Sequence, residues 1–218
     1  MGKFEGITIS SAGLREGVLT DLTGAAVSDP LLDGVIAFAR LDHNQIAFGQ
    51  ALHDFIAPAF APEADLFGSP AADLRIEKAA CMMADSAGRF HPDHRALMAY
   101  DQALRAPYSG VTHPERAMIA YAVGCRYEKD FKRPSEYVGL TSESQSERAR
   151  QLGSAMRLGA VFSGRSGPIL RRAQLSRDGD KLCLSVAKAD QAMVSETVSR
   201  RLAQTASALR LQPEILIG

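Results

Sequence analysis

Histidine and arginine side chains gather around a predicted helix start near Pro92, where they could bind an anion. The first N–H groups of a helix and the helix dipole both favour negative charge. This makes the segment the sharpest candidate phosphate site in the sequence, with the polyphosphate-binding candidates Arg89, His91, His94 and Arg95. The alternative is a solvated surface cluster in which Asp93 and neighbouring acidic residues neutralise these charges.

Two further groups of basic residues could hold a polyanion. One runs from the end of a predicted helix into a loop and consists of Arg126, Lys129, Lys132 and Arg133. The other surrounds a Gly-Ser-Gly turn and consists of Arg165, Arg171 and Arg172. Affinity for a polyanion adds over the charges that contact it. Cations near a helix C-terminus are also ordinary partners of the helix dipole, so both interpretations stay open.

The bulk composition of the chain excludes several classes of protein. Its 25 Lys and Arg balance its 25 Asp and Glu, so the overall charge predicts neither a nucleic-acid nor a membrane partner. No apolar run approaches the roughly 18 residues that a spanning helix needs, and we expect a cytoplasmic protein. Cys81, Cys125 and Cys183 lie far apart in apolar segments, which predicts buried free thiols.

The elements that must position these side chains are expected to be mostly helices. Apolar residues recur at helical spacing from Asp29, a plausible N-cap, to about Ala57, which predicts one long amphipathic helix. Further helices are expected at about 72–87, 92–104, 114–128 and 146–161, with a polar surface loop over 132–145. Five successive helices indicate a helical bundle.

The two ends of the chain have a different character. Alternating residues around a turn at 177–180 predict a β-hairpin, followed by a helix at about 190–209 and a last strand at 213–217. This order predicts a small α+β (β-β-α-β) unit in which one helix covers the sheet. At the other end, 6–10 predicts a short strand that leads into a short helix.

Several motifs along the chain resemble the exopolyphosphatase and guanosine pentaphosphate phosphatase (Ppx/GppA) family. The segment Ile9 to Leu19, with its Leu-Arg-Glu-Gly run, is similar to the end of that family's actin-like half. Further stretches follow in the order and spacing of the family's HD-like helices, at 79–88, 91–95, 110–116 and 120–123. The C-terminal segment 211–218 is similar to the terminal unit of some members, so the resemblance covers most of the chain.

The resemblance implies a mainly α fold, an HD-like helical bundle followed by the small α+β unit. It places the end of the actin-like lobe and a junction at 1–28, the HD-like domain at 29–165 and the terminal unit at 166–218. It also implies hydrolysis of terminal phosphates of polyphosphate or guanosine pentaphosphate with magnesium, carried out by the actin-like half. We find no Gly-rich phosphate loop in the sequence. We therefore expect this chain to be the C-terminal half of such an enzyme without the catalytic half. We also expect it to be inactive alone and homodimeric.

The metal centre of an HD phosphohydrolase is expected to be degraded here. Such a centre needs several His and Asp side chains that converge from different helices. Ala84-Asp85 stands where the His-Asp pair should fall, and the carboxylate expected near Arg157 is absent. His43 corresponds to the earlier ligand position, but a histidine on an apolar stripe is more often a hydrogen-bonded core residue. We therefore expect neither a metal ligand nor a catalytic residue in this chain.

Two functions from different classes remain open at this point. The chain could be the C-terminal domain of an exopolyphosphatase, where it would grip polyphosphate and make interdomain and dimer contacts. It could instead be a stand-alone, non-catalytic regulatory module that binds a polyanion or a protein partner. The first predicts that adding the missing half restores activity.

Overall fold

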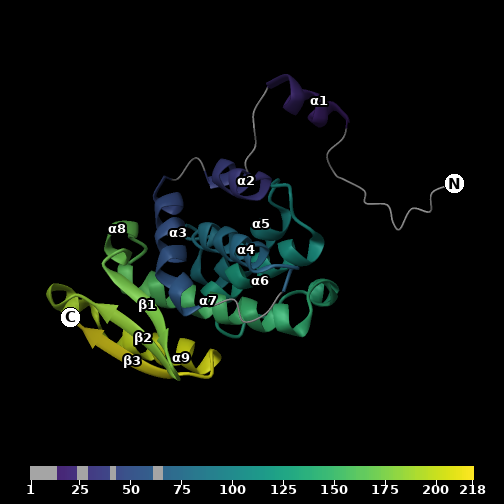
Figure 1. Cartoon of the computed structure of the whole chain (residues 1–218). Helices are drawn as coiled ribbons and strands as arrows, with labels where there is room; N and C mark the ends of the chain where they lie inside the picture. Colours follow the sequence, from purple (N-terminus) through teal and green to yellow (C-terminus); the bar gives the residue numbers. More distant parts are fainter. Residues whose placement is uncertain (1–13, 24–28, 40–42, 61–65) are drawn as a thin grey trace.

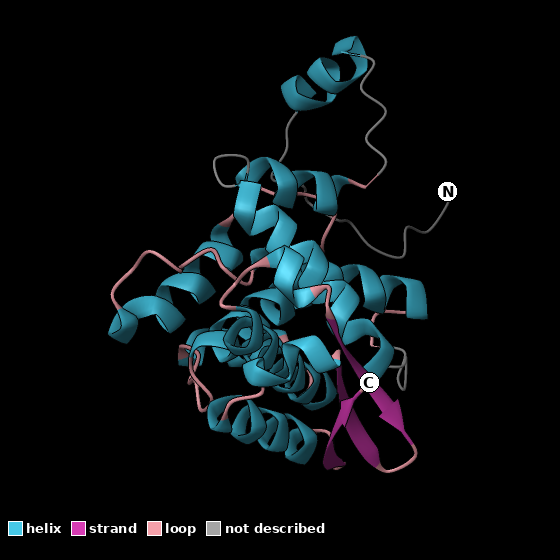
Figure 2. Ribbon diagram, turned by 90° about the vertical axis from the view of Figure 1, so that its left-hand side faces the viewer, coloured by secondary structure: helices cyan, strands magenta, loops and turns pink. Residues whose placement is uncertain are grey.

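The computed structural model describes residues 14–23, 29–39, 43–60 and 66–218, which form a helical body with a small sheet at one side (Figures 1 and 2). The helices are α1 (Leu14–Thr23), α2 (Pro30–Ala39), α3 (His43–Ile56), α4 (Pro70–Met83), α5 (Arg95–Arg105), α6 (His113–Tyr127), α7 (Glu143–Ser163), α8 (Gly167–Leu170) and α9 (Glu196–Ala208). The strands are β1 (Ala173–Asp178), β2 (Lys181–Val186) and β3 (Gln212–Ile217). Single 3-10 turns occupy Ala57–Ala59, Pro92–His94, Ser135–Leu140 and Lys188–Met193.

Side-chain caps fix where the central helices begin. The Ser69 hydroxyl accepts from the Ala72 N–H ahead of α4, and Pro70 follows as the first helical residue. Thr112 and Glu115 form a capping box at the start of α6. Ser142 and Gln145 form another at the start of α7. Each cap satisfies N–H groups that the helix itself leaves without partners.

Glycines allow the bundle helices to approach one another closely. A Cβ atom added to Gly49 of α3 would lie 2.5 Å from the Met82 Cα atom of α4. One added to Gly153 of α7 would lie 2.5 Å from the Cys125 Cβ atom of α6. Contacts this short leave no room for a side chain, so the distances between these helices are set by glycine.

The sheet has the strand order β1-β2-β3 and mixes two kinds of pairing. β1 and β2 are antiparallel and joined by a tight turn in which Gly179 has φ +58°. β2 and β3 are parallel, and α9 forms the connection between them, as parallel neighbours require. This confirms the predicted hairpin, helix and final strand.

One hydrophobic core runs through the bundle and into the sheet. It extends from Leu31 to Leu211 and includes Leu175, Leu184 and Leu202 from the terminal unit. All three cysteines are free and buried, as the sequence predicted. The division of the chain into 29–165 and 166–218 stays a prediction, and its boundary falls in the short link between α7 and α8.

The mainly helical class is confirmed, but several predicted boundaries were wrong. The single helix expected over 29–57 is two helices, because α2 ends at Ala39 and α3 begins at His43. The helix expected to reach residue 87 ends at Met83, and a run of turns follows it. The polar loop expected over 132–145 contains a 3-10 turn and the first residues of α7. The strand predicted at 6–10 lies outside the described residues.

Helix α1 stands apart from the bundle in both views (Figures 1 and 2). Its apolar side chains Leu14, Leu19 and Leu22 are more than half exposed. Such a helix buries too little apolar surface in this arrangement to be held by packing, which is the usual source of helix stability in proteins.

Candidate functional site: an arginine-lined pocket at Asp85

A pocket of about 740 Å³ opens where two turns of the chain meet. One is the turn after α4, which contributes Asp85, Ser86, Gly88 and Arg89. The other is the link from α7 to α8, which contributes residues 164–168. The remaining wall comes from the end of α2, the start of α3 and α5, with residues Phe38, Ala39, Asn44, Gln45, Ala47 and Gln102. The pocket therefore depends on the end of α4 at Met83, which turns Asp85 away from the helix.

Two arginines converge on the Asp85 carboxylate. The Arg126 Nη2 atom lies 3.5 Å and the Arg165 Nη1 atom 3.4 Å from its Oδ1 atom. Arg126 comes from the last turn of α6 and is almost completely buried, whereas the Arg165 side chain is about half exposed, at 49%. The sequence had placed these residues in different groups, and the fold brings them together with an excess of positive charge.

Further arginines lie close enough to this pair for their charges to act on one another. Burial lowers the pKa of Arg126, Asp85 opposes that shift, and the positive charges of Arg165 and Arg95 add to it. Burial also lowers the pKa of Arg157 to about 10, and the charges of Arg201 and Arg126 contribute to the shift. Arginine keeps its positive charge at neutral pH in proteins. We call this set the arginine row: Arg95, Arg126, Arg157, Arg165 and Arg201.

Arg157 and Arg201 were missed in the sequence analysis as contributors to this charge. The Arg157 guanidinium donates to the Cys125 and Arg126 carbonyl oxygens, which are acceptors at the end of α6. A signal was present, because Arg157 interrupts a run of small and apolar residues in α7. Nothing comparable marks Arg201, whose nearness to Arg157 depends on the packing of α9 against α7.

The backbone around Arg165 is held in an unusual conformation. Gly164 ends α7 with φ +60°, as glycine commonly does after a helix. Arg165 then adopts φ +69°, a left-handed conformation that costs a non-glycine residue about 1 kcal/mol or more. This strain favours a functional role for Arg165, because strained residues concentrate at functional sites.

Gly88 leaves the space that the Arg165 side chain occupies. A Cβ atom added there would lie 2.7 Å from the Arg165 Nη1 atom and 2.9 Å from the Asp85 Oδ1 atom. Any larger residue at this position would push the guanidinium group away from the carboxylate.

Comparison with protein families decides which family this chain represents. The family model described as exopolyphosphatase, C-terminal, matches residues 48–212, about three quarters of the chain. The chain belongs to the exopolyphosphatase C-terminal family. A search among curated proteins finds no match for the sequence. Every member of the arginine row lies within the part that the exopolyphosphatase model matches.

The fold separates the residues that were predicted to bind phosphate around the helix start near Pro92. Arg89 lines the pocket, and Arg95 donates to the Phe90 carbonyl oxygen while it also acts on Arg126. His91 and His94 are exposed, with ring centroids 6.0 Å apart. His91 Nδ1 accepts from the Asp93 N–H and lies 3.6 Å from the Asp93 carboxylate. These two histidines match the alternative of a solvated surface cluster more closely.

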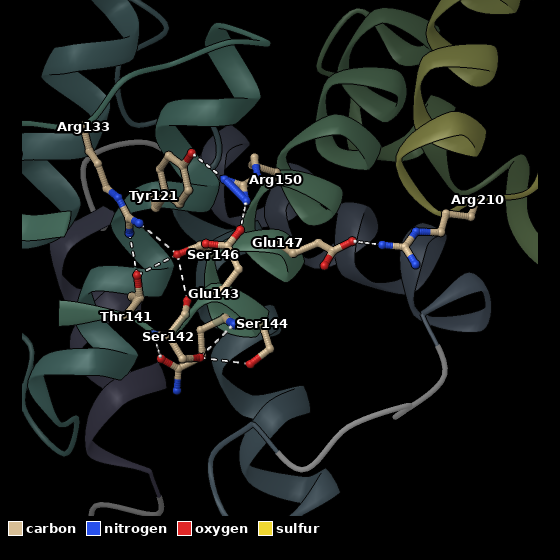
Figure 3. A network of polar contacts seen from close by, with 11 residues as sticks. Tyr121, Arg133, Thr141, Ser142, Glu143, Ser144, Ser146, Glu147, Arg150 and Arg210 are labelled. Carbon is tan, nitrogen blue, oxygen red and sulfur yellow. Dashed lines mark hydrogen bonds and ion pairs between the residues drawn. The ribbon is translucent and has the colours of Figure 1, made fainter. Parts of the chain in front are cut away.

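Arg133 belongs to a separate hydrogen-bonded network at the start of α7 (Figure 3). Its guanidinium group donates to the Thr141 and Ser146 hydroxyls and lies over the Tyr121 ring. These contacts leave it few free donors for a ligand. Lys129 and Lys132, expected in the same group, are exposed on the surface near the end of α6.

Arg171 and Arg172 line a different cavity, also of about 740 Å³. It lies between α3 and the ends of β2 and β3, and Asp54 lines it too. Arg172 already pairs with the buried Asp190, at 2.6 Å. The predicted third group of cations is thus split, with only Arg165 at the Asp85 pocket.

The residues at the Asp85 pocket do not fit a magnesium ion. Asp85 is the single carboxylate among the described residues that line it, and two guanidinium groups already neutralise it. Magnesium prefers several oxygen ligands in octahedral geometry. Among the residues whose side chains are described, no three His, Cys, Asp or Glu groups converge as a metal site requires. The His43 side chain lies outside the described part.

None of the helices in the described ranges combines the length and the apolar character needed to cross a bilayer.

Proposed function

We propose that this exopolyphosphatase C-terminal domain binds polyphosphate without hydrolysing it, in support of a phosphatase that releases terminal phosphates. The observation that carries the proposal is the gathering of Arg126 and Arg165 on a single carboxylate, Asp85, at an open pocket. Two cations against one anion leave a local excess of positive charge in a chain whose net charge is zero. Guanidinium groups suit this role because they bind phosphate oxygens in a bidentate manner.

The arginine row adds to the positive charge at the pocket. Its members come from α5, α6, α7, α9 and the link after α7, and the buried Arg126 and Arg157 act through their charge and not through contact with a ligand. A polyphosphate chain carries one negative charge or more at every unit, and its affinity would rise with each cation it meets. In the parent enzyme, the hydrolytic steps and the magnesium ion would belong to the actin-like half.

The proposal is tested by substitution of Arg165. Arg165→Ala should weaken binding of long-chain polyphosphate about fivefold, because a half-exposed guanidinium contributes on the order of 1 kcal/mol. Arg200→Ala is the matched control, since Arg200 is exposed on α9, which contributes no described residue to the pocket. Isothermal titration of both variants would measure the difference. Equal affinities of Arg165→Ala and Arg200→Ala would contradict the proposal.

We further propose that helix α1 provides a contact to a second copy in a homodimer. The support is the exposure of Leu14 and Leu22 on this helix, 87% and 78% respectively. Light scattering after gel filtration should give a dimer mass, and Leu14→Ser with Leu22→Ser should shift it towards the monomer. A monomer mass for the unchanged chain, or a dimer that the two substitutions leave intact, would contradict this part.

A further inference from the structure

Two polar atoms, one in the wall of the Asp85 pocket and one on a residue next to it, have no hydrogen-bond partner in the described part of the molecule. The Ser86 Oγ and Arg126 Nε atoms are both buried and unpaired. Ser86 lines the pocket, and Arg126 is nine-tenths buried directly behind Asp85. Unpaired buried polar groups are rare and costly, so their presence together needs a reason. Both atoms are closed to solvent in this arrangement, so an acceptor oxygen of a ligand could reach them only if it displaced neighbouring groups such as the Asp85 carboxylate.

The pairing at Asp85 is looser than an optimised ion pair. The arginine nitrogens lie 3.4 to 3.5 Å from the carboxylate oxygens. Charge-assisted hydrogen bonds between such groups are usually about 2.7 to 2.9 Å long. Because the two guanidinium groups share one carboxylate, several of their N–H groups remain able to donate hydrogen bonds to another acceptor. A dianionic group with three oxygens matches this arrangement better than a carboxylate does.

Terminal and internal units of a phosphate chain differ in the charge they carry. The end unit has three non-bridging oxygens and a second ionisation close to neutral pH, whereas an internal unit has two such oxygens and a single charge. The two guanidinium groups gathered on one carboxylate suit the end unit, which brings more charge and more oxygens than an internal unit does. Arg165 would contact it at the wall, and the buried Arg126 would supply fixed positive charge beside Asp85.

We propose that the Asp85 pocket binds the terminal phosphoryl group of a phosphate chain without a metal ion, and that Asp85 is a counter-ion which this group displaces. The inference rests on the proposed function and names the part of the ligand that the pocket takes. In a metal centre, an aspartate at this position would hold the cation that attracts phosphate. In this domain, arginines take the place of that cation, and the aspartate competes with the ligand for them.

The two roles of Asp85 predict opposite effects of one substitution. Asp85→Asn should tighten binding of tripolyphosphate in the presence of EDTA about fivefold, because the competing negative charge is removed. If Asp85 held a metal, the unchanged chain would not bind tripolyphosphate in EDTA, and the same substitution would abolish binding in the presence of magnesium. Asp178→Asn is the matched control, since it removes one charge from the exposed end of β1, away from the residues that line the pocket. Isothermal titration of the full chain gives each affinity.

A second variant keeps the proposal testable if Asp85→Asn does not fold. Arg165→Gln leaves Asp85 in place but removes the guanidinium group that lies 3.4 Å from its carboxylate. Tripolyphosphate binding should weaken about threefold to tenfold, with an unchanged melting temperature, because the contact of this half-exposed guanidinium with the ligand is lost. An affinity equal to that of the unchanged chain would overturn the assignment of Arg165 to this pocket.

Three small ligands distinguish the end group from other phosphates. Tripolyphosphate has two end units, cyclic trimetaphosphate has none, and orthophosphate is a single unit. We expect tripolyphosphate to bind at least about tenfold tighter than trimetaphosphate, since only the former offers a dianionic end. Trimetaphosphate binding as tightly as tripolyphosphate would overturn the end-group assignment. Orthophosphate resembles an end unit in its charge and free oxygens, so its failure to compete with tripolyphosphate when in large excess would overturn the assignment as well.

The proposed function and this inference can fail separately. The inference alone would be overturned if long-chain polyphosphate binds to the chain but Asp85→Asn lowers the affinity for tripolyphosphate or leaves it unchanged. Absence of binding to any of these ligands, long-chain polyphosphate included, would overturn both.

Discussion

The charge of Glu77 on α4 is buried, and Arg148 on α7 balances it. The Arg148 Nε atom lies 2.6 Å from the Glu77 Oε1 atom, and the Arg148 side chain also covers the Phe60 ring. Burial nevertheless raises the pKa of Glu77, against the opposing effect of Arg148. A buried pair of this kind is costly to break, because the remaining charge has no water around it.

Arg148→Met should destabilise the fold by about 3 kcal/mol at pH 7 and by less at pH 5. Because the folded state raises the pKa of Glu77, it binds the proton more tightly than the unfolded state does, so stability recovers as the pH falls. Urea denaturation at both pH values would measure this. Arg150→Met is the control, since its partner Glu143 is exposed, and it should cost less than about 1 kcal/mol. A loss for Arg148→Met that does not depend on pH would contradict this account of Glu77.

Part of the site could be predicted from single residues, and part could not. Arg126, Arg165, Arg89 and Arg95 were all named as candidates because cations near turns and helix ends are visible in a sequence. The sequence could not show that Arg126 and Arg165 share Asp85, since 41 and 80 residues separate them from it. The sequence also could not show that His91 and His94 would be exposed and away from the Asp85 pocket, and their role in phosphate binding stays a prediction.

At the scale of elements, the close contact of α6 and α7 depends on Gly153. Gly153→Ala should destabilise the protein by about 1 to 3 kcal/mol, because the new Cβ atom would overlap the Cys125 Cβ atom and the Ala122 carbonyl oxygen. Thermal denaturation would measure the loss. Gly139→Ala is the control, as no atom lies within 4 Å of an added Cβ there, and it should change stability by less than about 1 kcal/mol. Equal effects of the two substitutions would show that this helix contact tolerates added volume.

Capping residues explain which elements were predicted well. The proline residues in the first turns of α4 and α6 allowed the starts of both helices to be predicted close to their observed positions. The capping box of Ser142 and Gln145 was overlooked inside a polar segment, and the start of α7 was placed three residues late. Asp42 directly precedes the first residue of α3 and is a favoured N-cap type, yet the apolar period continued across it and suggested one helix. Periodicity alone does not detect such breaks.

At the scale of the whole molecule, the hairpin and β-β-α-β order were predicted because turn chemistry and alternation are local signals. The arginine row was not, because its members span residues 95 to 201 and meet only when the helices pack. The charges of the row add to the positive potential at the Asp85 pocket of this exopolyphosphatase C-terminal domain.

The measurement that tests the central claim most directly is a titration of the chain with long-chain polyphosphate, with and without magnesium, in which binding and phosphate release are followed together. We predict binding that does not require magnesium, that weakens about tenfold between roughly 50 and 200 mM salt, and that releases no phosphate. Release of phosphate by the chain would contradict the claim of binding without hydrolysis. Binding that is absent, or that appears only with magnesium, would contradict the claim that arginines hold the anion.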